Sequence, residues 1–122
     1  MKSFKKVLRE EYKKMAFNLI FAIFTFIIIL LFYKNILLTT GLLAIITLTG
    51  LIKWKSKVTL IIFLVVGVLG TASEIIAIYY GIWFYPIANF INVPVWLFFV
   101  WGNVGAFIYQ TSLEIKKLGV KK

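Results

Sequence analysis

The feature that most constrains this chain is a series of long runs without charged side chains. Residues 15–33 and 35–52 are uncharged, and between Val58 and Leu113 only Glu74 carries a charge. About 20 apolar residues in a helix, each adding about 1.5 Å, cross the hydrocarbon core of a bilayer. Apolar residues make up 62% of the chain, against about 45–50% in soluble domains. We therefore predict an all-α integral membrane protein.

The uncharged residues divide into four stretches that are each long enough for a transmembrane helix. The lysines at 53–57 separate the second stretch from the third, and a segment with two prolines at 81–94 separates the third from the fourth. Proline breaks a continuing helix. We predict a transmembrane domain at 15–113, with spans at about 15–33, 35–52, 58–80 and 95–111.

The basic residues predict how these spans are oriented. Six precede the first span, three lie between the second and third, and four follow the fourth, so that Lys34 alone falls on the other side. Basic residues in short loops stay on the cytoplasmic side of a membrane. We expect a multi-pass protein of the cell membrane with both termini in the cytoplasm. This topology accounts for the net charge of +10 without a nucleic-acid partner.

The two ends of the chain are basic. In residues 1–14, apolar side chains recur every three or four positions between lysines and an arginine. This spacing is typical of an amphipathic helix. It either lies on the cytoplasmic surface or extends the first span. With the basic tail at 114–122, it predicts contact with anionic lipid at the cytoplasmic face, in addition to the surrounding membrane lipid.

Missing residue types exclude much chemistry. The chain has no cysteine, no histidine and no aspartate, and its four acidic side chains are all glutamates. Disulfides, thiolate nucleophiles and a Ser-His-Asp triad are therefore excluded within one chain. We expect no cofactor and no metal site.

One glutamate lies within a predicted span. Gly67, Gly70 and Glu74 share a helix face, because they are spaced i, i+3 and i+7. An ionisable residue at such a depth is a functional candidate, since its burial is costly. An apolar setting favours the protonated carboxyl group, so Glu74 is a candidate catalytic acid. The alternative is that Glu74 joins helices structurally.

The fourth span carries the residues that we expect near Glu74. Asn103 lies at a similar predicted depth, which suggests a Glu74–Asn103 hydrogen bond, with a Ser73, Thr71 or tyrosine hydroxyl as the substitute partner. The segment 81–94 is rich in aromatic residues, which either form an interfacial belt or cover a pocket that opens sideways to lipid. The candidate ligand-binding residues are Asn103, Tyr85, Trp83, Trp101 and Gln110.

Glycines mark the expected helix contacts. Gly102 and Gly105 form a second small-residue patch beside that of Gly67 and Gly70. Small residues let helix backbones approach closely in a membrane. Four glycines exceed what we expect one helix pair to use, so we predict a homo-oligomer or a partner membrane protein.

A spaced pattern runs from Glu74 through Gly81, Tyr85 and Val93-Pro94 to Trp101. This pattern resembles a segment of the membrane-bound carotenoid-biosynthesis hydratases that act on bacterioruberin precursors. The resemblance covers some 28 of the 122 residues. It implies a pocket for an isoprenoid chain in the outer leaflet, with Glu74 as the acid that protonates an alkene.

These observations leave three functions open. The first is binding of a lipid or isoprenoid-like ligand in an outer-leaflet pocket between the third and fourth spans, around Glu74 and Asn103. The second is a small proton-coupled transporter that acts as an oligomer, since a membrane-embedded carboxyl group can carry a proton. The third is a structural or accessory membrane subunit.

Overall fold

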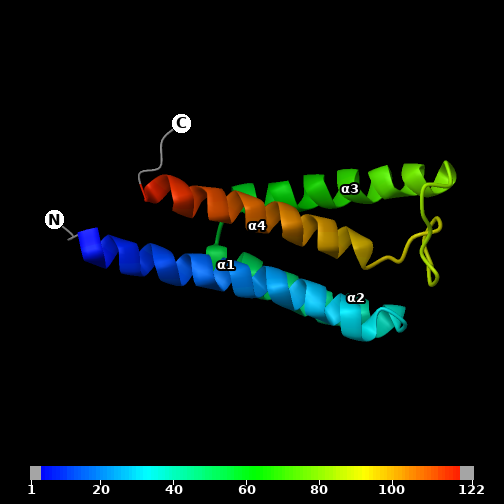
Figure 1. Ribbon diagram of the computed structural model, residues 1–122, viewed down its shortest axis with the longest axis horizontal. Coiled ribbons are helices and arrows are strands. Elements are labelled where there is room, and N and C mark those ends of the chain that lie inside the picture. The colour runs from blue at the N-terminus through cyan, green and yellow to red at the C-terminus, as the bar shows by residue number, and fades with distance from the viewer. Residues whose placement is uncertain (1–3, 119–122) are drawn as a thin grey trace.

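The computed structural model describes residues 4–118, which form four α-helices (Figure 1). Residues 1–3 and 119–122 of the predicted terminal segments lie outside the described part. The helices are α1 (Phe4–Phe32), α2 (Ile36–Trp54), α3 (Lys57–Tyr79) and α4 (Leu97–Lys117). Three of them, α1 to α3, are long and apolar enough to span a membrane. The predicted all-helical architecture is therefore confirmed, and the three long apolar helices support the predicted membrane character.

Helix α1 is longer than a single span requires. Its 29 residues extend about 43 Å at 1.5 Å per residue. The described part of the predicted amphipathic segment forms the first turns of α1, without a break before the apolar residues. Of the two arrangements considered for this segment, the structure has the one that extends the first apolar helix.

Two short turns connect the first three helices. Asn35 caps α2, because its side chain accepts a hydrogen bond from the Leu38 backbone N–H at 3.1 Å. Ser56 caps α3 by accepting from the Thr59 N–H at 3.1 Å. Between α2 and α3, Lys55 adopts a left-handed conformation with φ of 50°, which reverses the chain in a few residues. These caps satisfy N–H groups that the helix itself leaves without partners.

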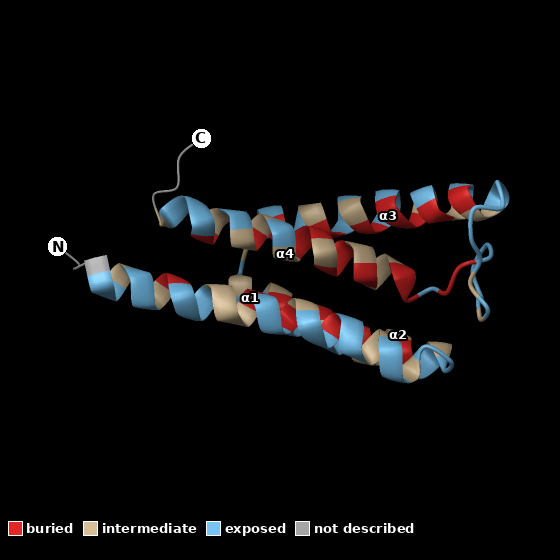
Figure 2. Cartoon of the chain, viewed as in Figure 1, coloured by how far each residue is buried: buried red, intermediate tan, exposed pale blue. Residues whose placement is uncertain are grey.

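Helix α4 packs against all three other helices, and its most extensive contact is with α3. Figure 2 shows exposed residues along the outward faces of the bundle and buried residues where the helices face one another. Helix α4 is less apolar than α2 and α3, and three of its polar side chains are buried. Asn103, Gln110 and Glu114 follow one face of α4 and point into the protein.

Hydrogen bonds across the bundle use this polar face. The Thr47 hydroxyl donates to Asn103 Oδ1 at 2.7 Å, and Asn103 Nδ2 donates to Thr25 Oγ1 at 3.2 Å. Gln110 Nε2 donates to Thr59 Oγ1 at 2.5 Å. Helix α4 is thus joined to α1 and α2 through Asn103 and to α3 through Gln110. Buried amides need such partners because leaving them unpaired costs free energy.

The four glycines that suggested an oligomer all lie in the contact between α3 and α4. A Cβ atom would lie 2.3 Å from Trp101 at Gly70, and 2.7 Å from Phe98 at Gly67. Reciprocally, Cβ atoms at the two α4 glycines would lie 2.4 Å from Phe63 (at Gly102) and 2.7 Å from Val66 (at Gly105).

The expectation that one helix pair could not use all four glycines is therefore wrong. Each helix alternates large residues with glycines, and the large residues of one fill the spaces over the glycines of the other. The glycines give no argument for an oligomer.

Residues 80–96 connect α3 to α4. We call the end of the bundle that they form the aromatic end. We call the opposite end, where α1 begins and α4 ends, the basic end. Ile91 and Asn92 have positive φ angles of 42° and 66°. They form a tight turn closed by an isolated bridge between Phe90 and Val93. The Asn89 side chain accepts a hydrogen bond from the Val95 N–H at 2.9 Å. This connection returns the chain from α3 to α4 with Val93 fully buried.

Candidate functional site

Glu74 forms a hydrogen-bonded cluster at the aromatic end. The Tyr85 hydroxyl donates to Glu74 Oε1 at 2.5 Å, and the Trp101 indole N–H donates to Glu74 Oε2 at 2.5 Å. Glu74 is 8% exposed. The cluster joins α3, the 80–96 connection and α4 through one carboxyl group.

The glycine at position 70 makes this cluster possible. Trp101 fits over Gly70, one turn of α3 before Glu74, so that its indole N–H reaches the carboxyl group. Residues i and i+4 lie on the same face of a helix. The sequence therefore places the space for the indole ring directly beside the acceptor for its N–H.

The expected hydrogen bond between Glu74 and Asn103 is not formed, because the two side chains face different neighbours. Trp101 and Asn103 are two positions apart, or about 200° around α4. Trp101 points to α3, whereas Asn103 contacts Thr25 of α1 and Thr47 of α2. A tyrosine hydroxyl, the substitute partner, takes the place of Asn103.

The remaining candidate residues do not gather around Glu74. Trp83 is exposed, and Gln110 is bonded to Thr59 elsewhere in the bundle. Of the five candidate ligand-binding residues, the structure brings Tyr85 and Trp101 to Glu74. Asn103 instead borders a cavity of about 190 Å³, which is lined by residues of α1 and α4.

An apolar cavity of about 430 Å³ lies at the aromatic end and forms a groove between α3 and the start of α4. We call it the aromatic-end groove. Helix α3 contributes Val68, Thr71, Ala72 and Ile75. The opposite wall comes from the 80–96 connection and α4 and includes Phe90, Val95, Phe98 and Phe99.

This groove was only partly predicted from the sequence. A pocket between these two helices is where we expected one, but neither Glu74 nor Asn103 lines it. The sequence signal for its α3 wall is the i, i+3, i+4, i+7 spacing of Val68, Thr71, Ala72 and Ile75. That stripe carries two small or polar residues among larger apolar ones.

Thr71 is the polar residue of the groove lining. Its side chain is 9% exposed, and within residues 4–118 its hydroxyl oxygen has no hydrogen-bond partner. A buried hydroxyl without a partner costs about 1–3 kcal/mol. A ligand that brought a polar atom within hydrogen-bond distance of this hydroxyl would recover that free energy.

Comparison of the chain with protein-family models, with curated proteins and with solved structures gives no match.

The surroundings of Glu74 determine what its carboxyl group does in this structure. Its two oxygens accept hydrogen bonds from an indole N–H, which only donates, and from a phenol. Phe90, Pro94 and Val95 of the groove belong to the connection that Tyr85 ties to α3. Glu74 thus fixes the position of one wall of the aromatic-end groove.

Alkaline titration tests the bond between Tyr85 and Glu74. Burial first, then the hydrogen bond to Glu74 and its charge, raise the pKa of Tyr85 above the ordinary value, which is about 10. Above about pH 10 the unfolded chain loses the Tyr85 proton, whereas the folded protein keeps it. The protonated Tyr85 hydroxyl therefore contributes fully to stability below pH 10, and its contribution declines as the pH rises above about 10.

We expect the absorbance of wild type and of Tyr85→Phe at 295 nm to rise together up to about pH 11, because Tyr85 stays protonated. The other five of the six tyrosines give the signal. A wild-type rise that exceeds that of Tyr85→Phe by one tyrosine near pH 10 would contradict the bond.

Proposed function

We propose that this protein binds a lipid or isoprenoid-like ligand in the aromatic-end groove between α3 and α4. The observation that carries the proposal is an apolar cavity of about 430 Å³ with one unpaired, buried hydroxyl, that of Thr71. Apolar pockets with few, well-placed polar groups are typical ligand sites. A long hydrocarbon ligand with one hydroxyl or carbonyl group matches this lining.

We further propose a four-span topology, with α4 as the fourth span and both termini in the cytoplasm. The polar side chains of α4 at positions 103 and 110 are bonded to threonines of other helices, so lipid does not contact them. The lysines at 53–57 and those of α4 lie at the ends of helices, in accord with a basic cytoplasmic face.

The role of the Glu74 cluster in this function is to position the groove. Glu74, Tyr85 and Trp101, which are part of the pattern resembling carotenoid hydratases, form one hydrogen-bonded cluster behind the groove wall. This arrangement is consistent with an isoprenoid ligand. It gives Glu74 the role of holding the 80–96 connection against α3.

The test is binding of geranylgeraniol, an isoprenoid alcohol, to the protein in lipid nanodiscs. Ala72→Trp places an indole in the groove, and we expect it to abolish binding. Ile61→Trp is the matched control, because Ile61 lies on an exposed face of the same helix and does not line the groove.

A second variant tests the hydroxyl group. Thr71→Val removes the hydroxyl while keeping the shape, and we expect affinity to fall about tenfold, the value of one hydrogen bond. Equal binding by wild type and Ala72→Trp would overturn the proposal. It would direct attention to the transporter and accessory-subunit alternatives.

A further inference from the structure

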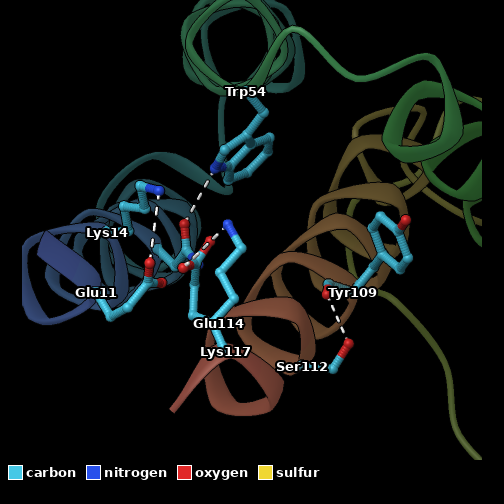
Figure 3. A network of polar contacts seen from close by, with 8 residues as sticks. Glu11, Lys14, Trp54, Tyr109, Ser112, Glu114 and Lys117 are labelled. Carbon is cyan, nitrogen blue, oxygen red and sulfur yellow. Dashed lines mark hydrogen bonds and ion pairs between the residues drawn. The ribbon is translucent and has the colours of Figure 1, made fainter. Parts of the chain in front are cut away.

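A third cavity, of about 310 Å³, lies toward the basic end, between α1, the end of α2 and α4. Figure 3 shows side chains from α1, the end of α2 and α4 meeting there. Its lining includes Lys14, Lys53 and Lys117, together with Asn18 and Glu114. The site is therefore both basic and hydrogen-bonding.

The lysines keep hydrogen-bonding capacity for a ligand. Lys14 Nζ lies 3.7 Å from Glu11 Oε1, and Lys117 Nζ lies 3.8 Å from Glu114 Oε2. Both distances exceed those of a hydrogen bond, which end near 3.2 Å. Lys53 Nζ lies over the Phe17 ring, 5.2 Å from its centroid. Three ammonium groups around one cavity attract an anion.

Two buried side chains in the cavity wall each have a polar atom that makes no hydrogen bond within residues 4–118. Asn18 is 2% exposed, and its Oδ1 accepts from the Trp54 indole N–H at 3.0 Å. Its Nδ2 has no partner among the described residues. Glu114 is 4% exposed, and its Oε2 accepts no hydrogen bond from any side chain or backbone group in residues 4–118. Asn18 Nδ2 therefore needs a hydrogen-bond acceptor, and Glu114 Oε2 needs a donor.

We propose that this cavity binds the headgroup of an anionic phospholipid that carries a hydroxyl group, such as phosphatidylglycerol. The phosphate interacts with the lysines and accepts from Asn18 Nδ2, and the headgroup hydroxyl donates to Glu114. Phe17, Trp54 and Leu113, which also line the cavity, contact the glycerol backbone.

The charges select this headgroup over a zwitterionic one. The three lysines outnumber Glu114 and the Glu11 that pairs with Lys14, so the site is net positive. A headgroup ammonium would be repelled by the lysines. The proposal needs a membrane-embedded chain but does not depend on the ligand of the aromatic-end groove.

The test is native mass spectrometry of the full chain, released from mixed micelles that contain phosphatidylglycerol. The test variant is Lys53→Gln, because Lys53 lines the cavity. The control is Lys55→Gln, which also removes one positive charge, two residues further along the chain, but at a residue that does not line the cavity. We expect Lys53→Gln to lower phosphatidylglycerol retention about tenfold, as for loss of a charged hydrogen bond. We expect Lys55→Gln to retain it like wild type.

Two probes examine the headgroup chemistry. Phosphatidylmethanol has the same single charge but no headgroup hydroxyl, and we expect retention about tenfold lower than that of phosphatidylglycerol. Equal losses in both lysine variants, or equal retention of both lipids, would overturn the proposal in favour of diffuse attraction to anionic lipid. Binding of glycerol 1-phosphate by protein that retains no phosphatidylglycerol would overturn the lipid assignment.

Discussion

Replacing Gly102 with alanine is expected to destabilise the protein by about 1–3 kcal/mol, the cost of overpacking a filled contact. The added Cβ would lie 2.4 Å from the Phe63 ring and 2.9 Å from the Phe63 carbonyl oxygen. The ring can rotate, but the carbonyl belongs to the backbone of α3, so the two helices must separate. The measurement is unfolding in mixed micelles with increasing dodecyl sulfate, followed by circular dichroism.

The matched control is Gly41→Ala in α2, where a Cβ meets nothing within 4 Å. Alanine favours a helix over glycine by about 1 kcal/mol, so this variant should be as stable as wild type or more so. The same substitution thus has opposite effects at two helical glycines. Equal effects at both positions would contradict the interlocked contact between α3 and α4.

The second large effect is expected for Glu74→Leu. Leucine fills a similar space but leaves the Tyr85 hydroxyl and the Trp101 indole N–H without their acceptor. Each unpaired buried donor costs about 1–3 kcal/mol, and since both side chains are only half-buried we expect about 2 kcal/mol in total. The 80–96 connection also loses its bond to α3, so protease cleavage within it should be faster.

Glu74→Gln separates the hydrogen bonds from the charge. The amide oxygen accepts from Trp101, and the amide NH₂ donates to Tyr85 once the phenol hydroxyl rotates, because a hydroxyl both donates and accepts. Stability should stay within about 1 kcal/mol of wild type. If leucine and glutamine proved equally mild, Glu74 would not hold the connection in place.

The candidate site illustrates what residue patterns predict about helix contacts. Spacing along α3 correctly placed Gly70 and Glu74 on one face. It did not reveal which face of α4 would meet them, because Trp101 and Asn103 lie two positions apart on opposite sides of that helix. Either was compatible with the predicted depth. The choice of Trp101 follows from Gly70, whose missing side chain leaves room for the indole ring.

The groove and the basic-end cavity were harder to predict for a related reason. Both are lined by residues from segments distant in sequence, such as Thr71 with Phe90 and Phe98, or Asn18 with Lys53 and Glu114. Periodicity within one helix describes one wall of a cavity. The second wall depends on how the helices cross.

The sequence by itself determined that this chain is helical and that its helices are long and apolar enough to span a membrane. Backbone groups in lipid must bond within the helix, so uncharged runs of this length favour helices. The tertiary structure decided which polar residues meet. It paired Glu74 with Tyr85 and Trp101, directed Asn103 to α1 and α2, and used all four glycines within one helix pair. The physical reason is that several faces of a helix offer similar apolar contact in a membrane. Close packing at small residues and the pairing of buried polar groups then select among them.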